Sequence, residues 1–178
     1  MGEPNRAEIF TPVNHKKENM RTKIKTREEI EIICNKIRNR KRIVTTNGSF
    51  DILHMGHVKS LKQAKSYGDV LIVCLNSDKS IQEYKSKERP IIPQLQRAEM
   101  LESLECVDYV VIFNETNPNK ILDIIKPHAH VKSKSGYKGL EESTIKKNKG
   151  KIILIDDIPG MSTTNMIFEI LKKEKAKK

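Results

Sequence analysis

The sequence contains no tryptophan, and aromatic residues make up only 4% of its 178 residues. Proteins that bind single-stranded nucleic acid stack the bases on aromatic side chains, so this scarcity argues against that class. The cysteines at 34, 74 and 106 are odd in number and have no CxxC spacing, which predicts reduced, structural thiols. No apolar run approaches the ~18 residues that a membrane span needs, and no secretory apolar segment follows Met1. We therefore expect a cytoplasmic protein that does not enter a membrane.

Basic residues exceed acidic ones, with 34 Lys and Arg against 23 Asp and Glu and a formal net charge of +11. Such an excess favours anionic partners such as nucleotides, sugar phosphates or nucleic acid. The alternative is that much of the lysine only solubilises the surface and the ends of the chain. A length of 178 residues with 37% hydrophobic content suits one α/β domain and is too short for two domains that each have a substantial core.

Short apolar runs separated by helical patterns indicate the fold class. Strands are predicted at 42–47, 70–75, 109–112, 128–131 and 151–155. Helical patterns begin near Thr26, His57, Gln94, Pro118, Glu141 and Ser162. This alternation predicts a single Rossmann-like α/β domain, a doubly wound parallel five-stranded sheet with helices on both faces. We expect the domain at 26–171, after a flexible basic N-terminal arm at 1–25 and before a Lys-rich tail at 172–178.

The loop after the first predicted strand carries the main motif, Thr46 to His57. In open parallel sheets, ligands bind beyond the carboxyl ends of the strands near the switch point, and this loop follows such an end. His54 and His57 are three residues apart around Gly56 at a helix start, so both imidazoles can face one anion beside helix N-terminal amides. Transfer of a nucleotidyl group needs mainly positioning and charge stabilisation, which such a pair supplies.

Two other interpretations of the histidine pair stay open from the residues alone. HxxH spacing is also found in metal sites, although no third cluster of ligands is evident in the sequence. The histidines could also be structural. The position between a strand with its Gly-Ser-Phe-Asp turn and a helix favours the phosphate interpretation.

A second motif, Pro159 to Thr164, offers a glycine and three hydroxyl side chains at a helix start. Backbone amides and hydroxyls in this arrangement can cradle phosphate groups. The alternative is an ordinary helix cap. The motif lies far from His54 in sequence, but both follow strand ends, so they can meet at one edge of the sheet.

Several separated segments in order resemble the HxGH nucleotidyltransferase superfamily, and most of all the adenylyltransferase domains of bacterial ADP-heptose synthases. The matching segments are 46–54, 76–78, 89–93, 96–98, 107–108 and 159–164, and the resemblance spans about residues 26–171. It implies transfer from a nucleoside triphosphate, favouring ATP, to a phosphorylated sugar or polyol such as heptose 1-phosphate, in making cell-surface glycan precursors. It also implies a homodimer. We further expect Mg²⁺ on the triphosphate, as is usual for such ligands, and no nucleic acid partner.

The resemblance also assigns expected roles to individual residues. The catalytic residues are His54, His57 and Lys85. The nucleotide-binding residues are Asn47, Gly48, Ser49, Phe50, Gly56, Lys87, Arg97, Gly160, Ser162, Thr163 and Thr164. The substrate-binding residues are Asp51, Lys120 and Lys132, although Asp51 could instead bond to loop amides, and no protein side chain is assigned as a metal ligand.

Two departures bear on substrate choice. Asp157 stands where cytidylyltransferases for glycerol phosphate carry an arginine, and the loop from Lys132 to Tyr137 lacks the aspartate of the heptose enzymes. A cytidylyltransferase acting on an alditol or glycerol phosphate is therefore one alternative function. A non-catalytic nucleotide- or RNA-binding module is the other.

Overall fold

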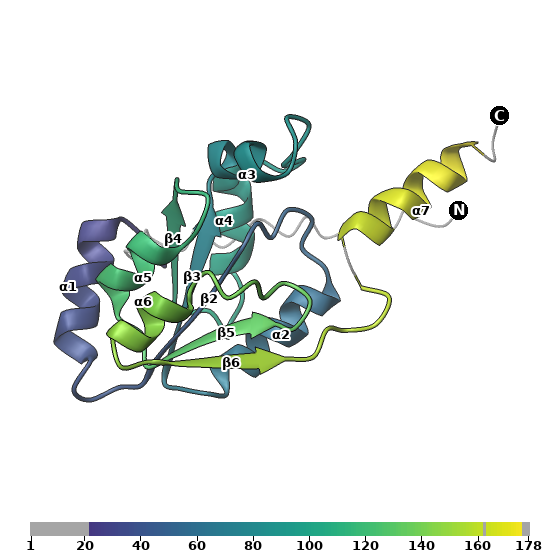
Figure 1. Cartoon of the computed structure of the whole chain (residues 1–178). Helices are drawn as coiled ribbons and strands as arrows, with labels where there is room; N and C mark the ends of the chain where they lie inside the picture. The colour runs from purple at the N-terminus through teal and green to yellow at the C-terminus, as the bar shows by residue number, and fades with distance from the viewer. Residues whose placement is uncertain (1–21, 162, 176–178) are drawn as a thin grey trace, which may run out of the picture.

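A computed structural model describes residues 22–161 and 163–175, whose six parallel strands form one sheet in the order β1-β4-β3-β2-β5-β6 (Figure 1). The strands are β1 (Ile24–Lys25), β2 (Ile43–Gly48), β3 (Val70–Asn76), β4 (Tyr109–Phe113), β5 (Ala129–Ser133) and β6 (Lys151–Ile155). All seven residues of β3 are buried, which agrees with the continuous apolar run that predicted a central strand. The parallel α/β sheet is confirmed, but the predicted count of five strands is wrong.

The additional strand is β1, which the sequence analysis placed in the N-terminal arm. Ile24 and Lys25 pair in parallel with Val110 and Val111 at the edge of the sheet. The backbone N–H of Lys23 also donates to a carboxylate oxygen of Glu102 at 2.9 Å. Two residues are too few to show the alternation that identifies a strand in a sequence. This strand is therefore identified by its pairing with β4 in the structure.

Helices cover both faces of the sheet, as predicted. They are α1 (Arg27–Ile37), α2 (Met55–Lys65), α3 (Asp78–Tyr84), α4 (Gln94–Glu102), α5 (Asn119–Ile125), α6 (Glu142–Lys147) and α7 (Thr163–Lys175). One hydrophobic core includes residues of α2 and α4, and the other includes residues of α1, α5 and α6. Thr26 caps α1 with a capping box, accepting from the Glu29 amide while Glu29 accepts from the Thr26 amide.

The last helix differs from the prediction at its end. α7 projects from the body of the domain and continues to Lys175, into the segment predicted as a tail (Figure 1). The prediction that Ser162 caps this helix lies outside the described residues. In the described part of the chain, no helix combines the length and apolarity required to cross a membrane.

The order of the strands places the switch point between β2 and β5. From β2 the chain proceeds outward through β3 to β4, and then returns to the other side of β2 for β5 and β6. The segments that follow β2, β5 and β6 therefore leave the sheet at neighbouring positions along the same edge. Both motifs identified in the sequence follow these strands.

Candidate active site

Two adjoining cavities lie at the carboxyl ends of these strands. The first, of about 350 Å³, we call the strand-end cavity; it is lined by Thr46, Asn47, Gly48, Ser49, Phe50, His57, Ser60, Leu61, Tyr84, Lys85, Val131, Lys132, Ser133, Gly136 and Ile155. The second, of about 300 Å³, we call the histidine cavity; it is lined by Ser49, His54, Gly56, His57, Ser60, Lys85, Arg89, Ser133, Asp157, Ile158, Met161, Thr163 and Thr164. Shared residues, including His57 and Lys85, join the two cavities into one site.

The two histidines form a stacked pair at the start of α2. Their ring centroids are 3.9 Å apart with an interplanar angle of 23°. The backbone N–H of His54 donates to Nδ1 of His57 at 3.4 Å, so the neutral His57 ring carries its proton on Nε2. The ring of Phe50 lies across His57, with centroids 5.2 Å apart. His57 is thus oriented by neighbours on both sides and presents an N–H donor.

Burial keeps this pair neutral near pH 7. Burial, followed by the nearby charges of His54 and Lys85, lowers the pKa of His57 to about 4, and burial lowers the pKa of His54. Lys85 places a positive charge beside the pair, and its Nζ donates to Ser49 Oγ at 3.0 Å. Burial and the charge of Arg89 lower the pKa of Lys85. The site therefore combines neutral imidazoles with a lysine cation.

Gly48 leaves room for the aromatic wall of the site. A Cβ at this position would lie 3.1 Å from Cε2 of Phe50. Phe50 itself has a φ of 43°, in the left-handed region that is uncommon for residues other than glycine. The tight turn after β2 therefore places the Phe50 ring where it contacts His57.

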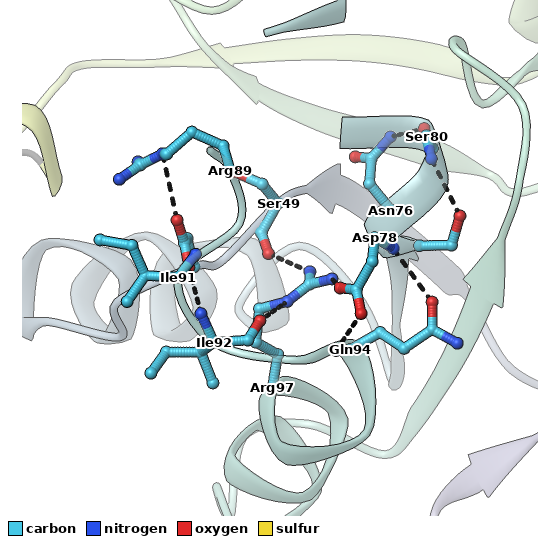
Figure 2. A network of polar contacts seen from close by, with 11 residues as sticks. Ser49, Asn76, Asp78, Ser80, Arg89, Ile91, Ile92, Gln94 and Arg97 are labelled. Atoms are coloured by element: carbon cyan, nitrogen blue, oxygen red, sulfur yellow. Dashed lines mark hydrogen bonds and ion pairs between the residues drawn. The ribbon is translucent and has the colours of Figure 1, made fainter. Parts of the chain in front are cut away.

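Arg97 does not reach either cavity. Its side chain is 1% exposed, and its guanidinium donates to the carbonyls of Ile92 and Ser49 and to the Asp78 carboxylate (Figure 2). Every nitrogen of the guanidinium thus has a protein partner. The predicted nucleotide-binding role has no support in this geometry, which instead makes Arg97 a support for the backbone at Ser49.

Asp51 also bonds within the protein, as the structural alternative proposed. Its Oδ1 accepts from the amides of Ile91 at 2.8 Å and Ile92 at 2.9 Å. Its side chain is buried and lines neither of the two cavities. Asp51 therefore fastens the loop before α4 to the motif after β2.

Lys132 lines the strand-end cavity, but its ammonium is engaged. Nζ donates to Asn47 Oδ1 at 2.9 Å and lies 3.5 Å from a carboxylate oxygen of Glu141. Both charged side chains are largely buried, and burial lowers the pKa of Lys132. This pair orients Asn47 at the end of β2, so Lys132 also has a structural role beside its predicted contact with substrate.

Lys132→Met should lower the free energy of unfolding by about 3–5 kcal/mol, because it leaves the Glu141 carboxylate buried without a cation. The double variant Lys132→Met/Glu141→Gln should recover much of that loss. Urea denaturation of both variants measures the effect. A Lys132→Met protein of unchanged stability but weakened substrate binding would instead support a direct substrate contact alone.

The remaining predicted residues divide between the site and the surface. Thr163 and Thr164 line the histidine cavity, while Ser162 lies outside the described residues. Gly160, with a φ of 73°, makes the turn before α7. Lys87 is exposed, and Lys120 is 76% exposed and 3.8 Å from Glu115; neither lines the two cavities. The structure therefore does not bring these two lysines to the site.

Sequence reasoning missed Arg89 and the role of Asp157 at this site. The Asp157 carboxylate accepts from the backbone N–H of Ser135 at 3.0 Å and from its hydroxyl at 2.7 Å. These bonds tie the unusual loop after β5 to the segment after β6. Arg89 stood inside a matched segment of the sequence, but nothing in its local pattern showed that it enters the cavity.

A fully buried histidine supports β2 and β5 below the site. Nδ1 of His130 lies 2.8 Å from Oγ1 of Thr45, and its Nε2 is buried with no hydrogen-bond partner among the described residues. Burial, followed by the charge of Lys132, lowers the pKa of His130 from 6.5 to about 3. Between these two values the unfolded chain binds a proton that the folded protein does not bind.

We expect the free energy of unfolding to fall as the pH drops from about 6.5 towards 3, with His130 contributing on the order of 2 kcal/mol by about pH 5. His130→Asn should lose stability at pH 7 but show a shallower decline over this range. Urea denaturation of both proteins at several pH values measures the two slopes. Equal slopes would show that His130 is not the group responsible.

Comparison with known proteins places this site in a family. The cytidylyltransferase-like family model matches residues 45–177. The bifunctional protein HldE of Aliarcobacter butzleri is 48% identical over 160 residues, which is 89% of this chain and 33% of that protein. The bifunctional protein HldE of a Nitratiruptor species is 52% identical over 147 residues, covering 81% of this chain and 31% of that protein. The chain thus spans about a third of the length of these relatives.

Solved structures agree with the fold. The lipopolysaccharide core biosynthesis protein from Thermoplasma volcanium GSS1 has a TM-score of 0.59 and 28% identity, covering 66% of this chain and 98% of that one. Pantoate-beta-alanine ligase from Francisella tularensis has a TM-score of 0.56 and 20% identity, covering 84% of this chain and 78% of that one. At this identity, the similarity shows a shared fold and nothing more. With a family model that matches most of its length and both motifs at one edge of the sheet, the chain belongs to the cytidylyltransferase-like family of nucleotidyltransferases.

Proposed function

We propose that the protein transfers the nucleotidyl group of a nucleoside triphosphate, ATP in preference to CTP, to a sugar phosphate such as heptose 1-phosphate, with release of pyrophosphate. The observation that carries this proposal is the meeting of His54, His57, Lys85 and the first residues of α7 around one cavity. The similarity to bifunctional HldE proteins supports an adenylyltransferase acting on a heptose phosphate. The product would serve as a precursor of lipopolysaccharide or another cell-surface glycan.

In the proposed reaction, a phosphate oxygen of the acceptor attacks the α-phosphorus in line. A new phosphorus–oxygen bond forms, the bond to the bridging oxygen between the α- and β-phosphates breaks, and pyrophosphate leaves with its electron pair. Nε2–H of His57 donates to an α-phosphate oxygen, where negative charge grows in the transition state. Lys85 neutralises the phosphates from its mobile side chain, and Thr163 and Thr164 hold the leaving pyrophosphate.

Mg²⁺ is proposed to accompany the triphosphate. Within residues 22–161 and 163–175, no group of three or more His, Cys, Asp and Glu side chains could hold a metal ion. Asp157 is the acidic residue among those described around the histidine cavity, and its carboxylate is bonded to Ser135. The donor set fits an ion held mainly by phosphate oxygens and water, which is how Mg²⁺ usually binds with nucleotides. It would offset charge on the triphosphate.

A screen of nucleotides against acceptors tests this proposal. Pyrophosphate release is measured with ATP, CTP, GTP and UTP, each against heptose 1-phosphate, glycerol phosphate and alditol phosphates. We expect turnover with ATP and heptose 1-phosphate. Activity with CTP alone would overturn the adenylyltransferase assignment and favour the cytidylyltransferase alternative, against which the bonded Asp157 carboxylate counts.

We also propose that the protein is a cytoplasmic homodimer. Exposed apolar side chains on α7, including Phe168, Ile170 and Leu171, support self-association, because covering an apolar surface lowers the free energy of the assembly. Sedimentation equilibrium measures the oligomeric state directly.

A further inference from the structure

Arg89 is a cationic residue of the histidine cavity that the mechanism above does not use. It lies in the loop between α3 and α4, and its side chain is only 17% exposed. Its Nη1 is buried and has no hydrogen-bond partner among the described residues. A buried donor without a partner is costly, so an oxygen from a ligand would satisfy it.

Asp51 holds the guanidinium in place. Its Oδ2 forms an ion pair with Nε of Arg89 at 3.2 Å, and its Oδ1 accepts from the amides of Ile91 and Ile92 just beyond Arg89. One buried carboxylate thus fixes both the side chain and the loop that carries it. In Figure 2 the terminal nitrogens of Arg89 point away from the bonded network around Arg97. The guanidinium is thus not part of that network, and Arg89 lines the histidine cavity instead.

Arg89 and Lys85 place two positive charges at the same cavity. Arg89 is close enough to Lys85 that its charge adds to the effect of burial in lowering the pKa of the lysine. Like charges repel, and the one Asp51 carboxylate, paired with Nε of Arg89, offsets only part of the two positive charges. An anion bound between the two cations would relieve this repulsion, and a planar guanidinium matches phosphate oxygens well.

We propose that Arg89 binds a phosphate of the nucleoside triphosphate and that Asp51 is its positioning residue. The inference rests on the proposed nucleotidyltransferase function. The triphosphate is the favoured ligand because the same cavity is lined by His54, His57 and Thr164, which that function assigns to the triphosphate.

Binding measured by isothermal titration calorimetry tests Arg89 without turnover. Wild type and Arg89→Gln are titrated with Mg²⁺-ATP and separately with pyrophosphate, and thermal melting checks that each is folded. We expect the Kd for ATP to rise about 10-fold or more in Arg89→Gln. Arg89→Lys should remain weakened, because an ammonium cannot contact Asp51 and a phosphate with separate edges. If Arg89→Gln does not fold, the Arg89→Lys variant provides the same binding test.

Arg27→Gln is the matched control. Arg27 is a partly buried arginine paired with the Glu115 carboxylate, and it lines neither cavity. Its loss should leave the Kd for ATP within about two-fold of wild type, since a partly exposed ion pair contributes little. An equal weakening in both variants would show a general loss of positive charge and overturn the assignment.

Asp51→Asn tests the positioning role. Asparagine keeps an oxygen for the two loop amides but removes the charge that Arg89 contacts. ATP binding should weaken in Asp51→Asn, and adding this change to Arg89→Gln should produce no further loss. Independent, multiplying effects in the double variant would overturn the positioning role.

The pyrophosphate titration separates this inference from the proposed function, because pyrophosphate carries neither base nor acceptor. Weakened pyrophosphate binding in Arg89→Gln supports the inference even if heptose 1-phosphate proves not to be the acceptor. Weakened ATP binding with unchanged pyrophosphate binding assigns Arg89 to the α-phosphate. Unchanged Kd values for both ligands overturn the inference, whatever the enzyme transfers.

Discussion

His57→Ala should lower kcat by about 10²–10³-fold while the Kd for ATP stays within a few-fold of wild type. His57 is neutral and is oriented by the His54 amide and the Phe50 ring, so its Nε2–H is aligned before charge develops on the α-phosphate. A donor fixed in this way stabilises the transition state more than the bound substrate. Pyrophosphate release and calorimetric titration with ATP measure the two quantities.

His128→Ala provides the control for the loss of an imidazole. His128 is exposed just before β5, and its Nδ1 accepts from the backbone N–H of Ile43 at 2.9 Å. It lies at the amino end of the strands, so kcat should be unchanged. If His57→Ala kept full turnover, the proposed role of the imidazole would be wrong. If wild type bound ATP but transferred to no acceptor, and His57→Ala bound it equally, the non-catalytic binding module would be favoured.

Gly56→Ala should reduce kcat by on the order of 10²-fold without destabilising the fold. A Cβ at Gly56 would lie 2.9 Å from Cε1 and Nδ1 of His54 and 3.0 Å from Cβ of Met161. Because real Cβ atoms do not approach other atoms so closely, the His54 ring must move and its stacking on His57 is lost. Alanine gains up to about 1 kcal/mol over glycine within a helix, which offsets part of the strain. Steady-state kinetics and thermal melting measure the two effects.

Two further variants test whether displacement of the His54 ring causes the lower kcat of Gly56→Ala. Lys59→Ala, on the exposed surface of the same helix, should leave both activity and melting temperature near those of wild type. Met161→Gly added to Gly56→Ala removes the Met161 Cβ that the new methyl group would contact at 3.0 Å but leaves the clash with His54, so activity should stay low. Recovery in this double variant would mean that Met161, and not His54, takes up the displacement.

Local patterns in the sequence predicted most of the framework. The uninterrupted apolar run of β3 identifies a strand covered on both faces, and the spacing of Ile30 and Cys34 identifies the buried side of α1. These features repeat within a few residues, because strands and helices expose or bury side chains with fixed periods. The HxGH motif, with its helix start and its preceding turn, is local in the same way. Its spacing indicated that His54 and His57 lie on one side of the helix start, and the structure has the two rings adjacent there.

Polar contacts between distant segments could not be predicted in this way. Arg97 and Arg89 lie eight residues apart in similar surroundings of the sequence, yet Arg97 is bonded within the protein and Arg89 lines the cavity. Which one faces the site depends on where Asp51 and Asp78 lie after folding. The same holds for Lys132 in β5, whose partner Glu141 is the residue just before α6.

Local patterns were therefore enough to predict the alternating α/β elements, the edge of the sheet that carries the candidate site, and the paired histidines. These depend on periodic burial and on short motifs in which every interacting residue is a near neighbour. Long-range contacts were needed to show that β1 joins the sheet, that Arg97 and Asp51 support the loops behind the site, and that Arg89 lines its cavity. The partner of a charged side chain depends on how segments far apart in the chain pack against one another, and a local sequence pattern contains no information about that packing.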